Sequence, residues 1–219
     1  MSKSGLVFDV SQAEQPGRLL EEVALLVRVL RAAQEADRIR PQHDQLEVLL
    51  ALGQTQTDQG KLSDAIQSYE NCLALKPDEF YATYNLANAY YTQKKYAKAA
   101  TYYEKAFAQK PDFPDSLVGL GASQLAANKL EAAIATYKKL IPLKPDDANV
   151  RFNFGTALFN AGKFQDAAAS YREAACLNPA FAHGHYNLGM ALLRLDDAKS
   201  AQAEFAEAHR LDPSLNPPK

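Results

Sequence analysis

The chain has 219 residues, of which 47% are hydrophobic and 23% are charged, a composition typical of a folded protein in water. Its net charge of -2 argues against nucleic acid as the partner, because phosphate binding requires a basic surface. No apolar run of about 18 residues occurs, so we expect no membrane span.

Residues 1–16 are expected to form a flexible N-terminal segment. The start of the chain lacks the long apolar core of a secretory signal, and two cysteines do not make a disulfide framework. Cys72 and Cys176 are therefore interpreted as thiols in a reducing compartment. Together these features favour a cytoplasmic location.

A long amphipathic helix is predicted next, over residues 17–39. Pro16 suits the start of this helix, and Pro41 is expected to stop it. Apolar residues recur in it at intervals of three and four, which predicts one buried face: Leu19, Val23, Leu26, Leu30 and Ala33. Residues 17–43 are therefore expected to form an extra helix. It could cap the following part of the chain, form a seam between two copies, or occupy the protein's own binding surface.

The rest of the chain, residues 44–213, repeats a unit of 34 residues five times without insertion. A proline closes each unit, with an alanine 12 residues before it and an aromatic residue eight before it. A small residue after an apolar one marks the first half of the unit. The proline column is Pro77, Pro111, Pro145, Pro179 and Pro213; the alanine column is Ala65, Ala99, Ala133, Ala167 and Ala201; the aromatic column is Tyr69, Tyr103, Tyr137, Tyr171 and Phe205; the small column is Gly53, Ala87, Gly121, Gly155 and Gly189. Such self-similarity indicates a repeat architecture.

Each unit predicts two helices joined by a tight turn. Apolar and small residues recur at helical spacing in two blocks, and a short polar break such as 59–61 or 161–163 separates them. The small residue and the alanine would let the two backbones approach closely. The aromatic residue is expected to fill the wedge between neighbouring hairpins. The proline is expected to stop the second helix, because it has no backbone N–H to donate.

These columns resemble the tetratricopeptide repeat (TPR) family. The stretch FYATYNLANAYYTQKKYAKAATYYEKAFAQKPD is similar to that family's consensus, and YNLGMALL and FNFGTALF are variants of the same motif. The resemblance covers Leu46 to Pro213 and implies an all-α fold, a right-handed α-solenoid of TPR helical hairpins with an additional N-terminal helix. The repeats are expected at residues 46–79, 80–113, 114–147, 148–181 and 182–213, followed by a tail at 214–219.

The fifth repeat is predicted to end the stack. In the earlier repeats the second helix carries two apolar columns that would face the next hairpin. In the last repeat these columns hold Gln202 and His209. Polar side chains there would leave no apolar face for another hairpin, so we expect no sixth repeat.

The resemblance also implies that the first helices of successive repeats line a concave face that holds a partner. The helix period places aromatic, amide and other side chains of three first helices on that face. Among them, Tyr84, Phe152 and Tyr186 are the rings expected to touch the ligand, because large rings bury much area at a small entropic cost. The predicted peptide-binding residues are Tyr81, Tyr84, Asn85, Asn88, Tyr91, Phe152, Asn153, Thr156, Phe159, Tyr186, Asn187, Met190 and Arg194.

Two features characterise the expected ligand. Arg194 is the only cation among these positions, which argues against a clamp for a C-terminal carboxylate. Asparagines recur at one position of the hairpin, as Asn85, Asn153 and Asn187. An amide both donates and accepts hydrogen bonds, so this column could hold an extended peptide backbone of any sequence. It resembles the asparagine ladder of long superhelical TPR arrays; the alternative is that asparagine is simply common at this position.

No pattern in the sequence predicts catalysis or a cofactor. His183 and His185 are two residues apart on a predicted helix and point to different faces, so we do not expect them to share a metal. A catalytic Ser/His/Asp set, a phosphate-binding loop and a zinc-ligand spacing are all absent from the sequence. The prediction is a protein that is not an enzyme and that uses no cofactor and no metal.

The leading hypothesis is a scaffold or adaptor that binds a peptide or helix of a partner protein in its concave groove. One alternative is a chaperone that shields an apolar segment of a client. Another is a self-assembling scaffold, a homo-oligomer formed through the N-terminal helix. All three are functions of binding, as the absence of catalytic patterns requires.

Overall fold

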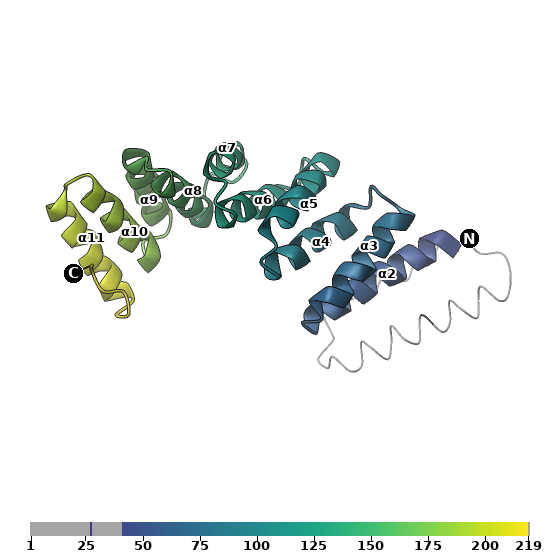
Figure 1. Cartoon of the computed structure of the whole chain (residues 1–219). Coiled ribbons are helices and arrows are strands. Elements are labelled where there is room, and N and C mark those ends of the chain that lie inside the picture. Colours follow the sequence, from purple (N-terminus) through teal and green to yellow (C-terminus); the bar gives the residue numbers. More distant parts are fainter. Residues whose placement is uncertain (1–26, 28–40, 219) are drawn as a thin grey trace, which may run out of the picture. The chain divides into compact units, whose positions relative to one another are not determined.

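The computed structural model describes residue 27 and residues 41–218, and its regular structure in these ranges is entirely helical (Figure 1). The all-α prediction is therefore confirmed. The segments 1–16 and 17–39 lie outside the described residues, except for Val27, which is helical. The helices are α2 (Pro41–Asp58), α3 (Leu62–Leu75), α4 (Phe80–Thr92), α5 (Tyr96–Gln109), α6 (Asp115–Ala126), α7 (Leu130–Leu140), α8 (Ala148–Asn160), α9 (Phe164–Leu177), α10 (Ala182–Arg194) and α11 (Ala198–Leu211).

The first helix of the repeats begins earlier than the sequence predicted. The helix α2 starts at Pro41, and the expected end of a preceding helix at this proline falls on residues outside the described ranges. Proline suits the first position of a helix, because the N–H that it lacks would have no acceptor within the helix there. Residues 41–43 therefore belong to α2, and not to the end of an N-terminal helix.

The chain divides into two compact parts after Ala89, and each is described by itself. In the first part, α2 packs against α3, and α4 begins. In the second part, each helix from α5 to α11 packs on the next one along the chain, from teal to yellow in Figure 1. In addition, α8 contacts α6 and α10, so the first helices of successive hairpins are neighbours there. This arrangement is what brings the predicted site residues of α8 and α10 together.

A residue with left-handed backbone lies in every turn between the two helices of a hairpin. These residues recur at the repeat spacing and have φ between 57° and 76°: Gly60, Lys94, Asn128, Gly162 and Asp196. The next residue donates its N–H back into the preceding helix, as from Lys95 to the carbonyl of Tyr90 at 2.9 Å. This hydrogen bond satisfies a carbonyl that the helix end would otherwise leave without a partner. The polar breaks therefore form one type of turn, although only two of them contain glycine.

In the four hairpins whose small residue is glycine, the aromatic ring of the column lies over that glycine. A Cβ atom added to Gly155 would be 2.8 Å from the Tyr171 ring, and one added to Gly53 would be 2.5 Å from the Tyr69 ring. The expectation that this ring only fills the wedge between neighbouring hairpins was therefore incomplete. The glycine leaves room for the ring, which is why a small residue recurs at that position. The alanine column is fully buried, at 0% exposure in all five repeats.

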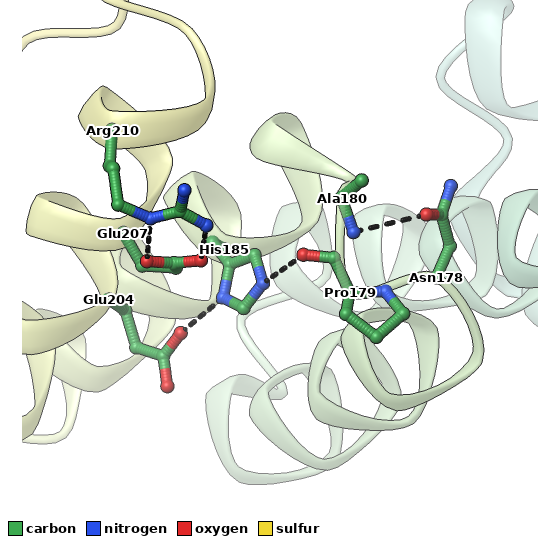
Figure 2. A network of polar contacts seen from close by, with 7 residues as sticks. All are labelled: Asn178, Pro179, Ala180, His185, Glu204, Glu207 and Arg210. Carbon is green, nitrogen blue, oxygen red and sulfur yellow. Dashed lines mark hydrogen bonds and ion pairs between the residues drawn. The ribbon is translucent and has the colours of Figure 1, made fainter.

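A polar network holds the last hairpin to the connection that precedes it (Figure 2). The ring of His185, on α10, contacts Glu204 of α11 at 2.7 Å through Nδ1 and the carbonyl oxygen of Pro179 at 3.2 Å through Nε2. Beside it on α11, Arg210 donates to both carboxylate oxygens of Glu207, at 2.8 and 2.6 Å. Both ring nitrogens of His185 are therefore engaged in positioning α10 between its neighbours.

Candidate functional site

In the first part of the chain, the predicted site residues Tyr81 and Tyr84 gather around a ring that sequence reasoning omitted. Phe80 lies edge-on to Tyr81, with 5.1 Å between the ring centres, and stacks on Tyr84 at 6.0 Å. Tyr81 is 56% exposed, so this residue lies largely at the protein surface. Asn85 and Asn88 follow on the same helix and are half-buried. These residues form an aromatic and amide surface on α4.

In the second part, two of the predicted contact rings are partly used in packing. Phe152 on α8 lies 5.5 Å from the ring of Tyr171 and 4.9 Å from that of Phe181. Tyr186 on α10 lies 5.3 Å from the ring of Phe205. Both residues are half-buried, so each is partly accessible to solvent while it packs against other rings. Tyr91, which also belongs to this part, lies against Tyr96 at 5.4 Å.

Five predicted residues line one cavity between α8 and α10, which we call the α8–α10 pocket. Its volume is about 230 Å³. The pocket is lined by Thr156, Phe159, Asn160, Tyr171, Tyr186, Asn187 and Met190. Phe159, Tyr186 and Met190 give it apolar walls, whereas Thr156, Asn160, Asn187 and the hydroxyl of Tyr171 supply polar atoms.

The polar side of the α8–α10 pocket is organised around the hydroxyl of Tyr171. This hydroxyl donates to Oγ1 of Thr156 at 3.1 Å, and Asn187 also forms a hydrogen bond with it. Thr156 in turn donates to the carbonyl of Phe152 at 3.0 Å. Burial raises the pKa of Tyr171, and its hydrogen bonds with Thr156 and Asn187 lower that pKa. The phenol therefore stays protonated and fixes the orientation of the amide of Asn187.

In the asparagine column, Asn187 forms a hydrogen bond with the hydroxyl of Tyr171 in the preceding hairpin. Asn153 is half-buried on α8, in the repeat before Asn187. The equivalent position in the repeat before that is Gly119, and a Cβ atom there would overlap the ring of Tyr103. The column position thus faces the aromatic ring of the preceding hairpin. Asn187 bonds to the hydroxyl of Tyr171, whereas the buried hydroxyl of Tyr137, at the equivalent position in the hairpin before Asn153, has no hydrogen-bond partner among the described residues.

Arg194 lies at the end of α10, beside the pocket wall. Its guanidinium is 5.6 Å from the ring centre of Phe159 and 5.4 Å from that of Phe164. Those two rings meet edge-to-face at 5.2 Å. The predicted cation of the groove is therefore held over two aromatic rings.

Sequence reasoning missed three residues of this region. Tyr171 was assigned only to the structural aromatic column, yet its hydroxyl lines the pocket. Asn160 ends α8 and Phe164 begins α9. Neither residue was among those that the helix period predicted to face the groove. Their proximity to Phe159 along the chain is a signal that could have identified them, because a side chain at the end of one helix meets those at the start of the next.

The described residues offer no arrangement for metal chemistry. Within residue 27 and residues 41–218, no group of three or more His, Cys, Asp or Glu side chains could hold a metal ion. The two ring nitrogens of His185 contact Glu204 and the carbonyl oxygen of Pro179. In the same ranges no helix is both long enough and apolar enough to cross a membrane.

Two models of a known protein family match the sequence of this chain. A tetratricopeptide repeat model matches residues 50–112 and 152–216, and a second tetratricopeptide repeat model matches residues 91–151. The chain belongs to the tetratricopeptide repeat family. The matched residues run through all five hairpins, so the predicted TPR array is confirmed as a series of consecutive repeats.

Solved structures of other TPR proteins are similar to this chain. MamA 41-end from Desulfovibrio magneticus RS-1 is 20% identical, with a TM-score of 0.75 over 78% of this chain and 97% of that one. YrrB, described as a TPR protein with an unusual peptide-binding site, is 21% identical, with a TM-score of 0.70 over 86% and 92%. MamA AMB-1 is 23% identical, with a TM-score of 0.68 over 77% and 92%. At such identities the likeness concerns the fold alone. No curated protein matches the sequence.

Proposed function

We propose that this TPR protein is an interaction scaffold that holds an extended peptide segment of a partner protein along its first helices. The observation that carries the proposal is the α8–α10 pocket, in which five independently predicted residues line one cavity. The side chains that line the pocket are aromatic rings, amides, a threonine and a methionine, which suit the binding of a peptide.

The size of the pocket supports a side chain as its occupant. A cavity of about 150 Å³ can hold a benzene molecule, and the α8–α10 pocket has about 230 Å³. An apolar side chain could enter between Phe159, Tyr186 and Met190, while the amide of Asn187 bonds to the peptide backbone. Asn153 and, on α4, Asn85 are proposed to act in the same way.

YrrB, whose solved structure is described as having a peptide-binding site, provides a precedent for this function in a similar fold. Neither alternative function has an observation of this kind in its favour. The N-terminal segment that self-assembly would use lies outside the described residues, and an apolar groove for a client would lack the amides seen here. The cytoplasmic location inferred from the sequence stays a prediction.

A displayed library of random 12-residue peptides, selected on the full-length protein, tests the proposal. We expect the enriched peptides to lose binding when Asn85, Asn153 and Asn187 are all replaced by alanine, and when Met190→Lys places a charge in the pocket. The control is Gln165→Ala with Ala169→Lys, at two exposed positions of α9. The proposal is wrong if the enriched peptides bind both groove variants as tightly as the unchanged protein.

A further inference from the structure

Arg194 is a cation that two aromatic rings hold in place, and no residue in the described part of the chain forms an ion pair with it. Its guanidinium lies over Phe159 and Phe164, which meet edge-to-face and form a corner around it. Contacts of a guanidinium with aromatic faces are favourable by about 0.5–1 kcal/mol at exposed sites. They also leave the N–H groups at the edge of the planar guanidinium free to bond elsewhere.

No acidic group of the described residues uses those donors. The arginines Arg151 and Arg210 pair with Glu173 and Glu207, but no ion pair includes Arg194. Two carboxylates follow it in the turn, at Asp196 and Asp197. Asp197 is engaged elsewhere, since it accepts from the backbone N–H of Ser200 at 3.1 Å and caps α11.

The position of Arg194 relates it to the α8–α10 pocket. Tyr186, Met190 and Arg194 are four residues apart along α10, so they share one side of this helix. Tyr186 and Met190 line the pocket, and Phe159 both lines it and supports the guanidinium. The pocket therefore has apolar walls and a polar side at Tyr171 and Asn187, and the positive charge of Arg194 lies beside it, over Phe159.

We propose that Arg194 gives the pocket a sequence preference, so that it binds an internal peptide segment with an acidic residue next to an apolar one. The apolar side chain occupies the pocket, and the Asp or Glu carboxylate accepts hydrogen bonds from the guanidinium. This inference rests on the proposed peptide-binding function and adds specificity to it. The carboxylate comes from a side chain, because Arg194 is the sole cation among the predicted groove residues, whereas a clamp for a chain terminus needs several cations.

The same displayed library, in which the peptide's C-terminus is fused to the carrier and is not free, tests the preference. We expect peptides selected on the unchanged protein to be enriched in Asp or Glu beside an apolar residue. Selection on Arg194→Glu should replace the acidic residue by Lys or Arg at that position. Arg172→Glu is the matched control, because Arg172 is exposed on α9 and does not line the pocket; its selected peptides should keep the acidic residue.

Synthetic copies of the enriched peptides then give affinities. Arg194→Gln should weaken binding about tenfold, the size of effect expected for a charge-assisted hydrogen bond. Arg194→Lys, which keeps the charge but loses the planar contact with the rings, should weaken it less. Amidated and free-acid forms of each peptide should bind equally well; a free acid that binds tenfold more tightly would assign the carboxylate to the chain terminus and overturn the proposal.

The outcomes separate this inference from the function on which it rests. Peptides that depend on Asn187 and Met190 but show no acidic preference, or keep that preference on Arg194→Glu, would overturn the role of Arg194 and leave the scaffold function standing. Peptides that depend on none of these residues would overturn both.

Discussion

The hydroxyl of Tyr171 donates to Thr156 at 3.1 Å, whereas the equivalent hydroxyl of the preceding hairpin, on Tyr137, has no hydrogen-bond partner among the residues that the structure describes. Both rings are buried, at 1% and 0% exposure. The position of Thr156 is taken by Ala122 in the earlier hairpin, and alanine offers no acceptor. A buried polar group without a partner costs about 1–3 kcal/mol. Burial also raises the pKa of Tyr137, so the phenol stays protonated and its donor stays unused.

Replacing Ala122 by threonine should therefore stabilise the protein. The new hydroxyl can accept from Tyr137, and we expect the free energy of unfolding to rise by about 1 kcal/mol after the lower helix propensity of threonine is subtracted. Ala122→Val is the control, because valine has the same shape without the hydroxyl. Urea unfolding followed by circular dichroism measures the difference. Equal midpoints for the two variants would mean that the hydroxyl gains no partner.

The turn after α4 predicts a second stabilising change. Lys94 has φ of 59°, where a side chain with a Cβ atom is strained by about 1 kcal/mol, and the same turn contains Gly60 and Gly162 in other repeats. Lys94→Gly should raise the free energy of unfolding by about 0.5–1 kcal/mol, since it removes the strain but loosens the unfolded chain. Lys94→Ala removes the charge and keeps the strain, so its stability should not rise. A gain of the same size in the alanine variant would attribute the effect to charge instead of backbone conformation.

The two thiols should differ sharply in reactivity. Cys72 is fully buried, and burial raises the pKa of its thiol to about 11, with Glu79 adding to the shift and Lys76 opposing it. Cys176 is exposed. Because the thiolate is the reactive form, a charged disulfide reagent at pH 8 should label one thiol rapidly and the second only on unfolding. Cys176→Ser should remove the rapid phase, and rapid labelling of both thiols in the native protein would contradict the burial of Cys72.

The raised pKa of Cys72 also predicts how stability depends on pH. The folded pKa lies above the ordinary value of 9.0, so the unfolded state ionises first as the pH rises. The contribution of this thiol to stability is therefore complete below about pH 9 and is lost as the pH increases toward 11. Comparing the alkaline unfolding of the protein with that of Cys72→Ala isolates the effect: the variant should lose less stability between pH 9 and 11.

The repeat columns predicted the hairpins because each column marks a packing requirement that recurs in every repeat. The same columns could not reveal what differs between repeats. Pro142 occurs in one repeat only, and α7 ends at Leu140, which makes it 11 residues long, whereas α9 has 14. Lys94 adopts the conformation that Gly60 adopts, although the two residues have opposite backbone preferences. Neighbouring residues in the hairpin impose that turn on the lysine.

The sequence could predict which site residues share one face of a helix, but not how neighbouring hairpins pack against each other. The helix period predicted that Tyr186, Asn187 and Met190 share one face of their helix, and in the structure they line a pocket with Thr156 and Phe159. It could not predict that Phe152 and Tyr186 would also pack against other rings, because this depends on how far one hairpin is offset from the next. For the same reason the contact between Arg194 and Phe164 could not be read from either helix separately.

The contact of Gly155 with Tyr171 predicts a large cost for a small change. An added methyl group would lie 2.8 Å from the ring, and the ring is buried, so Gly155→Ala should lower the free energy of unfolding by about 1–3 kcal/mol despite the better helix propensity of alanine. Gly184→Ala is the matched control in α10, because the methyl group there would meet Phe181 only at 3.3 Å, and Phe181 is half-buried. Its loss should be smaller. Combining Gly155→Ala with Tyr171→Leu, which removes the ring, should cost less than the sum of the two single changes. Additive losses would mean that the ring does not cause the cost at Gly155, and an alanine at Gly155 that is tolerated as well as one at Gly184 would contradict the proposed reason for the glycine column.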